Sequence, residues 1–136
     1  MRILLGIFGV AALVGVVACG EMETESERRG KDLYTSFCVS CHGVRGVADG
    51  PLAQSLPVAP ADLSQLSASN DGVFPTERVM VQVFGYPGKF HQGLMPEFGP
   101  LLEGEQVEWV SPSGEKTLTP RALLDIVAYV KTLQET

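Results

Sequence analysis

The chain has 136 residues, of which 45% are hydrophobic and only 7% aromatic, and its formal net charge at pH 7 is −6. A chain of this length forms one small domain, whose apolar core benefits from a bound cofactor. The acidic balance argues against nucleic-acid binding and against electrostatic attachment to anionic lipid, and it indicates that a protein partner would present a basic surface.

The first 18 residues predict an export signal. Arg2 supplies a short positive region, and residues 3–17 form an apolar stretch whose length and flanks are more typical of a signal peptide than of a membrane-spanning helix. The end of this stretch, Val16-Val17-Ala18-Cys19, resembles the bacterial lipoprotein signal, in which the cysteine is diacylated and becomes the mature N-terminus. We therefore expect a signal peptide over 1–18 and a lipidated N-terminus and tether over 19–26. An ordinary signal peptide and a retained anchor helix are the alternatives.

All three alternatives export the domain that follows. Two acyl chains on Cys19 would suffice for stable anchoring. The expected location is therefore the cell envelope, with the domain lipid-anchored to a bacterial membrane and facing the periplasm or the exterior.

The first predicted helix begins at a capping box. Thr24-Glu25-Ser26-Glu27 has the required spacing, and the helix is expected to run to about Cys38. Its apolar residues form one buried stripe, and Gly30 lies on the same face, where it would permit close approach of another helix. The stripe consists of Leu33, Tyr34 and Phe37.

The motif Cys38-Val39-Ser40-Cys41-His42 has the spacing at which haem is attached in c-type proteins. Two thiols three positions apart can each form a thioether with one porphyrin, and His42 can then bind the iron as the proximal ligand. Three other interpretations are a thiol redox motif, half of a zinc site, and a strained disulfide. Nothing like a βαβ pattern accompanies the motif, and the sequence contains no second cysteine pair.

The central part of the chain alternates loops with short helices. Residues 43–64 are rich in glycine and proline and predict a loop, and Asp62 can cap a short helix to about Ala68. Residues 75–84 predict a helix that Gly85 ends, with Val79, Met80 and Val83 facing inward. A second long loop is expected over 86–100.

The last third of the chain predicts a β-hairpin followed by a helix. Residues 107–118 alternate around Ser111-Pro112-Ser113-Gly114, which favours a hairpin with Trp109 packed on one face. Thr119 and Pro120 are expected to be the N-cap and first residue of a helix to about Gln134. Its apolar face comprises Leu123, Ile126, Val127, Val130 and Leu133.

With these elements in view, residues 27–134 resemble class I cytochromes c. Besides the haem motif, the matches are Gly30 and Tyr34 in the first helix, Tyr129 in the last helix, Gly50-Pro51-Leu52, and Gly93-Leu94-Met95-Pro96. The resemblance implies an all-α cytochrome c-like fold of about four helices around one covalent haem c, in a domain over 27–136. The β-hairpin before the last helix would be an insertion.

The resemblance also implies roles for particular residues. Cys38 and Cys41 would attach the haem, His42 and Met95 would be its axial ligands, and the Pro51 carbonyl would accept the imidazole N–H. Three alternatives for the sixth ligand remain open, namely Met80, His91 and an open site. A methionine within an amphipathic helix is more often core filler, which disfavours Met80.

The function that these features predict is transfer of single electrons between respiratory redox partners by a membrane-tethered monohaem cytochrome. No constellation of acid–base or nucleophilic residues indicates an enzyme. One alternative is a cytochrome subunit of a membrane oxidoreductase complex. Another is a gas-binding or sensing haem protein with an open distal side.

Overall fold

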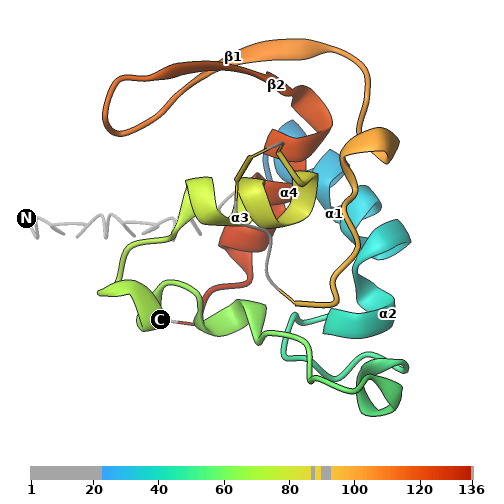
Figure 1. Cartoon of the computed structure of the whole chain (residues 1–136). Helices are drawn as coiled ribbons and strands as arrows, with labels where there is room; N and C mark the ends of the chain where they lie inside the picture. Colours follow the sequence, from blue (N-terminus) through green and yellow to red (C-terminus); the bar gives the residue numbers. More distant parts are fainter. Residues whose placement is uncertain (1–22, 87, 90–92, 136) are drawn as a thin grey trace, which may run out of the picture.

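The computed structural model describes residues 23–86, 88–89 and 93–135. Within these ranges the chain forms the helices α1 (Glu25–Phe37), α2 (Val39–His42), α3 (Thr76–Phe84) and α4 (Arg121–Thr132), and a hairpin of β1 (Gln106–Val110) and β2 (Lys116–Pro120). Figure 1 shows the helices gathered together and the hairpin extending across the top of them. Among the described helices, none combines the length and the hydropathy that a membrane-spanning segment needs.

Helix α1 begins at the predicted capping box. The backbone N–H of Glu27 donates to Thr24 Oγ1 over 3.2 Å, and the Glu27 carboxylate accepts from the Thr24 N–H over 2.6 Å. The reciprocal bonds confirm this start, so Glu25 and Ser26 belong to the helix. Phe37 ends the helix, and Cys38 caps it.

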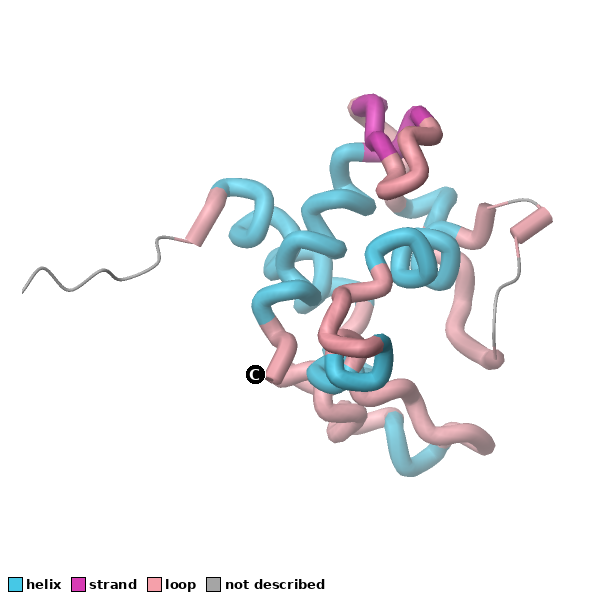
Figure 2. The backbone as a smooth tube through the Cα atoms, turned by 90° about the vertical axis from the view of Figure 1, so that its left-hand side faces the viewer, coloured by secondary structure: helices cyan, strands magenta, loops and turns pink. Residues whose placement is uncertain are grey.

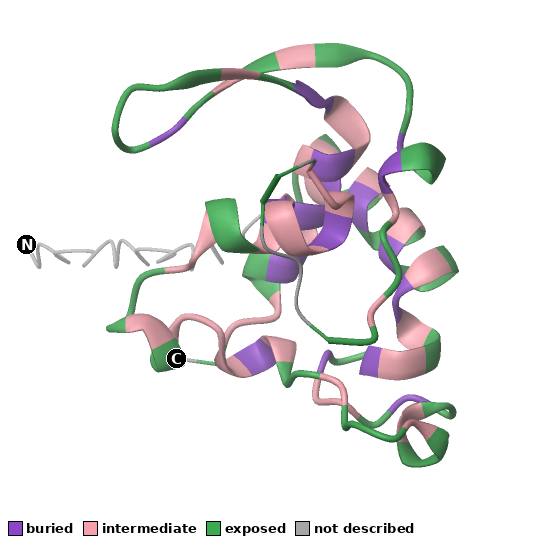
Figure 3. Ribbon diagram, in the orientation of Figure 1, coloured by how far each residue is buried: buried purple, intermediate pink, exposed green. Residues whose placement is uncertain are grey.

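The crossing of α1 and α4 forms the centre of the core. The two helices make the most extensive contact between any two elements described, and the Tyr34 and Tyr129 rings lie 5.2 Å apart at the crossing. Gly30 is buried there, as its position on the predicted stripe indicated. Figure 3 shows the buried segments concentrated where α1, α3 and α4 meet. These buried apolar residues include Tyr34, Met80, Val83, Leu102, Leu123, Ile126, Val127 and Val130.

Helix α3 also follows its prediction. It ends at Gly85, whose φ of 75° is left-handed and therefore favours glycine. Met80 is 2% exposed and Val83 is buried, whereas Val79 is half-buried against the core. The short helix expected after Asp62 is instead two separate 3₁₀ turns, Leu63–Gln65 and Ala68–Asn70. Asp62 does cap the first, because its carboxylate accepts from the Ser64 N–H over 2.9 Å.

The hairpin is antiparallel, with Trp109 opposite Thr117 and Glu108 opposite Leu118. Successive side chains alternate between faces, so Val107, Trp109, Thr117 and Thr119 share the more buried face. Figure 2, turned by 90°, also shows the hairpin projecting from one end of the helices. Trp109 packs against the core, as predicted.

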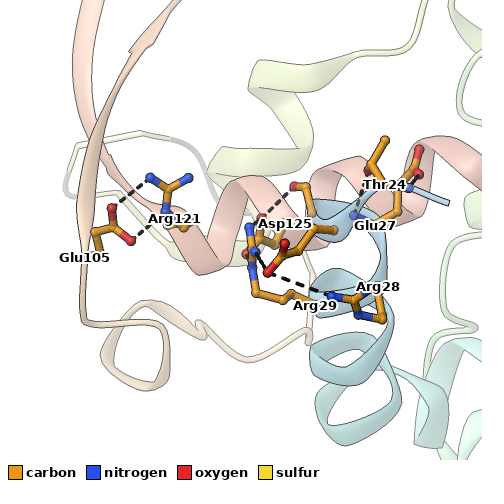
Figure 4. Close-up of polar contacts among 9 residues, drawn as sticks. Thr24, Glu27, Arg28, Arg29, Glu105, Arg121 and Asp125 are labelled. Carbon is orange, nitrogen blue, oxygen red and sulfur yellow. Dashed lines mark hydrogen bonds and ion pairs between the residues drawn. The ribbon is translucent and has the colours of Figure 1, made fainter.

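The start of α4 differs from its prediction. Thr119 and Pro120 belong to β2, and Arg121 is the first helical residue. Thr119 is fully buried and its hydroxyl lies 3.3 Å from the Tyr86 hydroxyl, so it does not cap the helix. Arg121 instead makes three hydrogen bonds to Glu105, one through its backbone N–H at 2.8 Å and two through its side chain (Figure 4). The strand continues because these bonds hold its end beside β1.

Candidate haem site

The end of α1 and helix α2 bring the residues of the Cys-x-x-Cys-His motif to one cavity. Cys38 caps α1, and one turn of α2 then carries Cys41 and His42 to the same wall. Gly43 ends that turn with a φ of 78°, and its carbonyl accepts a 2.7 Å hydrogen bond from the buried Tyr34 hydroxyl. The motif is therefore fastened to α1 on both sides.

His42 is buried, and its Nδ1 lies 2.9 Å from the carbonyl oxygen of Ala61. Because a carbonyl only accepts, Nδ1 carries the ring proton and Nε2 keeps its lone pair. Burial lowers the pKa of His42, and the bond to Ala61 only partly opposes that shift. The ring is thus held neutral and in the tautomer that a metal-binding imidazole requires.

The expected hydrogen bond from the His42 imidazole to the Pro51 carbonyl is not formed, because the Ala61 carbonyl takes its place. Gly50 packs against the backbone of α2, where an added Cβ would lie 2.5 Å from the Val39 carbonyl oxygen, and Leu52 N–H donates to Ser40 over 2.8 Å. These contacts leave Pro51 exposed beside the backbone of α2. The hydrogen-bond acceptor for the imidazole is the Ala61 carbonyl.

The contact with Ala61 depends on the return of the loop. Leu63 N–H donates to the Gly46 carbonyl over 2.7 Å and thereby draws residues 61–63 back past the motif. Ala61 takes part through its backbone alone, so its side chain offered no indication of this role.

The two thiols are free in the structure, and Cys38 is the more buried. Burial, with a smaller contribution from Cys41, raises the pKa of Cys38 to about 12. A thiol redox motif needs a thiolate of lowered pKa, so this environment disfavours that interpretation. Within the described ranges, no three His, Cys, Asp or Glu side chains gather as metal ligands would.

The cavity has a volume of about 450 Å³ and is lined mostly by apolar side chains. Its walls come from α1, α2, α3, α4, residues 56–66 and residues 93–98. A largely apolar cavity with two thiols and a neutral imidazole on one wall fits a covalently attached porphyrin. Cys38, Cys41 and His42 would hold the haem.

The three candidates for the sixth ligand lie in different places. Met95 lines the cavity and packs against the core, whereas Met80 is 2% exposed within the core and does not line the cavity. His91 lies outside the described residues, and so does Cys19. Of the two described methionines, only Met95 shares the space with His42.

The segment that carries Met95 is held at both ends. At its start the Tyr86 ring packs 4.4 Å from Phe84 and its hydroxyl reaches Thr119 of the hairpin. At its end Phe98 N–H donates to the Val83 carbonyl over 2.8 Å, and the Phe98 ring lies 5.9 Å from Phe37. The hairpin therefore contacts the base of this segment, a link that the sequence did not indicate.

Comparisons with known proteins agree with this geometry. The chain matches the family described as cytochrome C oxidase, cbb3-type, subunit III over residues 25–112, a range that begins at the first residue of α1 and includes the motif and Met95. The comparison with curated proteins finds no match. The chain therefore belongs to the cbb3-type subunit III family of c-type cytochromes, whose cytochrome c domain holds haem c covalently and transfers electrons.

Proposed function

We propose that the chain carries a single haem c on Cys38 and Cys41, with His42 and Met95 as axial ligands, and transfers one electron at a time. The observation that carries this proposal is the cavity that these four residues share. When bound, the haem supplies an iron that alternates between the ferric and ferrous states. A neutral imidazole and a thioether saturate such an iron, and the soft sulfur raises its reduction potential.

The surroundings suit a carrier better than an enzyme. The cavity wall contains no carboxylate among the described residues, and its histidine is taken by the iron in this proposal. With both axial positions occupied, a substrate has no place to bind. The apolar walls exclude water and keep the environment of the haem similar in the two oxidation states.

The ligand assignment is tested by replacing each candidate. Met95→Ala should lower the reduction potential, abolish the far-red sulfur-to-iron charge-transfer band and admit carbon monoxide to the ferrous protein. Met80→Leu conserves volume and should cost less than about 1.5 kcal/mol while leaving all three properties unchanged. His91→Ala should leave them unchanged too.

Two results would contradict the assignment. If the charge-transfer band is retained in Met95→Ala and lost in Met80→Leu, Met80 and not Met95 is the sixth ligand. Carbon monoxide binding to the unaltered protein at neutral pH would indicate an open distal site, as in a gas-binding protein.

We also propose that Cys19 is lipidated after cleavage of residues 1–18 and tethers the domain to the outer face of a bacterial membrane. The apolar stretch before Cys19 supports this, together with the need of c-type haem attachment for an extracytoplasmic compartment. Cys19→Ser should release a haem-bearing domain into the soluble fraction. Retention of that variant in the membrane after a carbonate wash would instead indicate an uncleaved helix.

The redox partner that we propose is a membrane oxidoreductase complex with a basic docking surface. The family description, a subunit of a cbb3-type oxidase, supports the class of partner, and the net charge of −6 supports the sign of its surface. Val58 and Leu94 line the cavity yet are 63% and 62% exposed, so an apolar contact at the haem edge would accompany the charges. Co-purification with an oxidase at low but not at high ionic strength tests this.

A further inference from the structure

Among the described residues, one permanently charged side chain lines the otherwise mainly apolar cavity. This is Arg78, in the first turns of α3 and itself exposed, whereas no Asp, Glu or Lys of the described residues contributes to the wall. A guanidinium at the edge of an apolar cavity offers five donors in a fixed planar arrangement to an acceptor inside that cavity.

Within the described part of the chain, Arg78 makes no ion pair and no hydrogen bond through its side chain. Every other described arginine has a carboxylate partner: Arg28 and Arg29 reach Glu25, Arg29 also reaches Asp125, Arg45 reaches Asp49, and Arg121 reaches Glu105. The neighbouring carboxylate of Glu77 lies 3.6 Å from Lys89 instead. Arg78 is therefore the described arginine that is available for a ligand in the cavity.

The chemistry of the group expected in the cavity supplies an acceptor. Haem c carries two propionate carboxylates on the porphyrin edge opposite the one that bears the thioethers. Cys38 and Cys41 fix the thioether edge beside α2, and Figure 1 shows the first turn of α3 on the side of the fold away from α2. A porphyrin attached through these cysteines would direct its carboxylates away from α2.

We propose that Arg78 binds a haem propionate and raises the reduction potential of the haem; the proposal rests on covalent haem attachment as proposed above. Guanidinium and carboxylate match as a planar, two-bond pair. A positive charge held there favours the reduced haem, which carries one positive charge fewer than the oxidised haem. Because Arg78 is exposed, salt weakens its effect.

The test compares three variants of the full-length holoprotein. Arg78→Gln removes the charge and keeps a helix-forming residue, Arg78→Lys keeps the charge but loses the planar pair, and Arg28→Gln removes a charge from an exposed arginine on α1 that does not line the cavity. The readouts are the midpoint potential at two ionic strengths and the propionate-bending band in resonance Raman spectra.

We expect Arg78→Gln to shift the potential downward and to displace the propionate band, with a smaller potential shift at high salt. Arg78→Lys should recover part of the potential, and Arg28→Gln should leave both readouts unchanged. The proposal is overturned if Arg78→Gln leaves the potential equal to that of Arg28→Gln. It is also overturned if Arg78→Gln weakens only the binding of a redox partner, with potential and propionate band unaltered.

Failure of the wider proposal would look different. If Met95 is not a ligand, the charge-transfer band is absent from the unaltered protein, yet the comparison between Arg78→Gln and Arg28→Gln still reports on the propionate. If no haem is attached, no variant has a haem spectrum, and covalent attachment itself is refuted.

Discussion

Gly30 of α1 lies directly against the main chain of Asp125 on α4. A Cβ built on Gly30 would stand 2.6 Å from the Asp125 carbonyl carbon and 2.9 Å from Tyr129 Cβ. Neither atom can move without moving α4, so the absence of a side chain at Gly30 determines how closely the helices that frame the cavity approach.

Gly30→Ala tests this contact because two effects oppose each other. Helix propensity alone would make alanine more favourable by about 1 kcal/mol. Overpacking typically costs about 1–3 kcal/mol, and contacts this close to a backbone belong at the upper end of that range, so we expect a net decrease of about 2 kcal/mol in the free energy of unfolding. Urea unfolding of the holoprotein measures it. Lys31→Ala, one residue further on an exposed position of α1, is the control and should change little.

Asp125 also joins the helices through its carboxylate. The side chain is buried and accepts from Ser26 Oγ over 2.6 Å and from Arg29 Nε over 2.7 Å (Figure 4). Burial by itself would raise the pKa of Asp125, but the hydrogen bonds from Arg29 and Ser26 outweigh it and lower the pKa. We expect Asp125→Asn to lower the free energy of unfolding by about 1.5–3 kcal/mol at neutral pH.

The pH dependence of that difference follows from the direction of the shift. A carboxyl whose pKa is lowered on folding stabilises the fold fully above its unfolded pKa, about 3.9, and loses that contribution as the pH falls through the folded value. The gap in stability between the native chain and Asp125→Asn should therefore narrow below about pH 4. Asp32→Asn, a change at an exposed position of α1, should show no such gap. A gap that stayed constant down to pH 2 would exclude this role for the Asp125 charge.

The Tyr34 hydroxyl fixes the backbone of Gly43, the residue that directly follows the Cys-x-x-Cys-His motif. It is buried, donates to the Gly43 carbonyl over 2.7 Å, and its pKa is raised above the ordinary value chiefly by burial. Tyr34→Phe should therefore cost about 1–1.5 kcal/mol in the free energy of unfolding, the loss of one buried hydrogen bond. Tyr129→Phe is a matched control, because the Tyr129 hydroxyl donates to no described residue. Equal effects of the two substitutions would show that the Gly43 bond adds nothing.

The contact of Tyr86 with Phe84 and Thr119 predicts a role for the hairpin in holding Met95. If Met95 binds the iron as proposed, Tyr86→Ala should loosen the start of the Met95 segment, so that the sulfur-to-iron charge-transfer band disappears at a lower temperature than in the native chain. Global unfolding, followed by far-ultraviolet circular dichroism, should change less. Val110→Ala is the control, because Val110 lies on the same hairpin and is 52% exposed, and it should alter neither transition.

Much of the fold was predictable from the sequence because its determinants are local. The capping box at Thr24, the left-handed Gly85 and the alternation around Trp109 each specify an element through neighbours a few residues apart. The end of β2 was mispredicted for the opposite reason. Thr119 and Pro120 form a good helix start by spacing, but long-range bonds between Arg121 and Glu105 and burial of Thr119 extend the strand instead.

The candidate site likewise has features that follow from local sequence and features that depend on tertiary packing. The sequence by itself determined the haem motif, because the thioether attachment and proximal ligation that we propose for Cys38, Cys41 and His42 require one fixed spacing. Only the tertiary structure decided that Met95 and not Met80 faces the cavity, that the Ala61 carbonyl and not that of Pro51 meets the imidazole, and that Arg78 stands at the cavity wall. Every residue has a carbonyl and methionine serves equally as core filler, so which of them reaches the site depends on how distant segments pack.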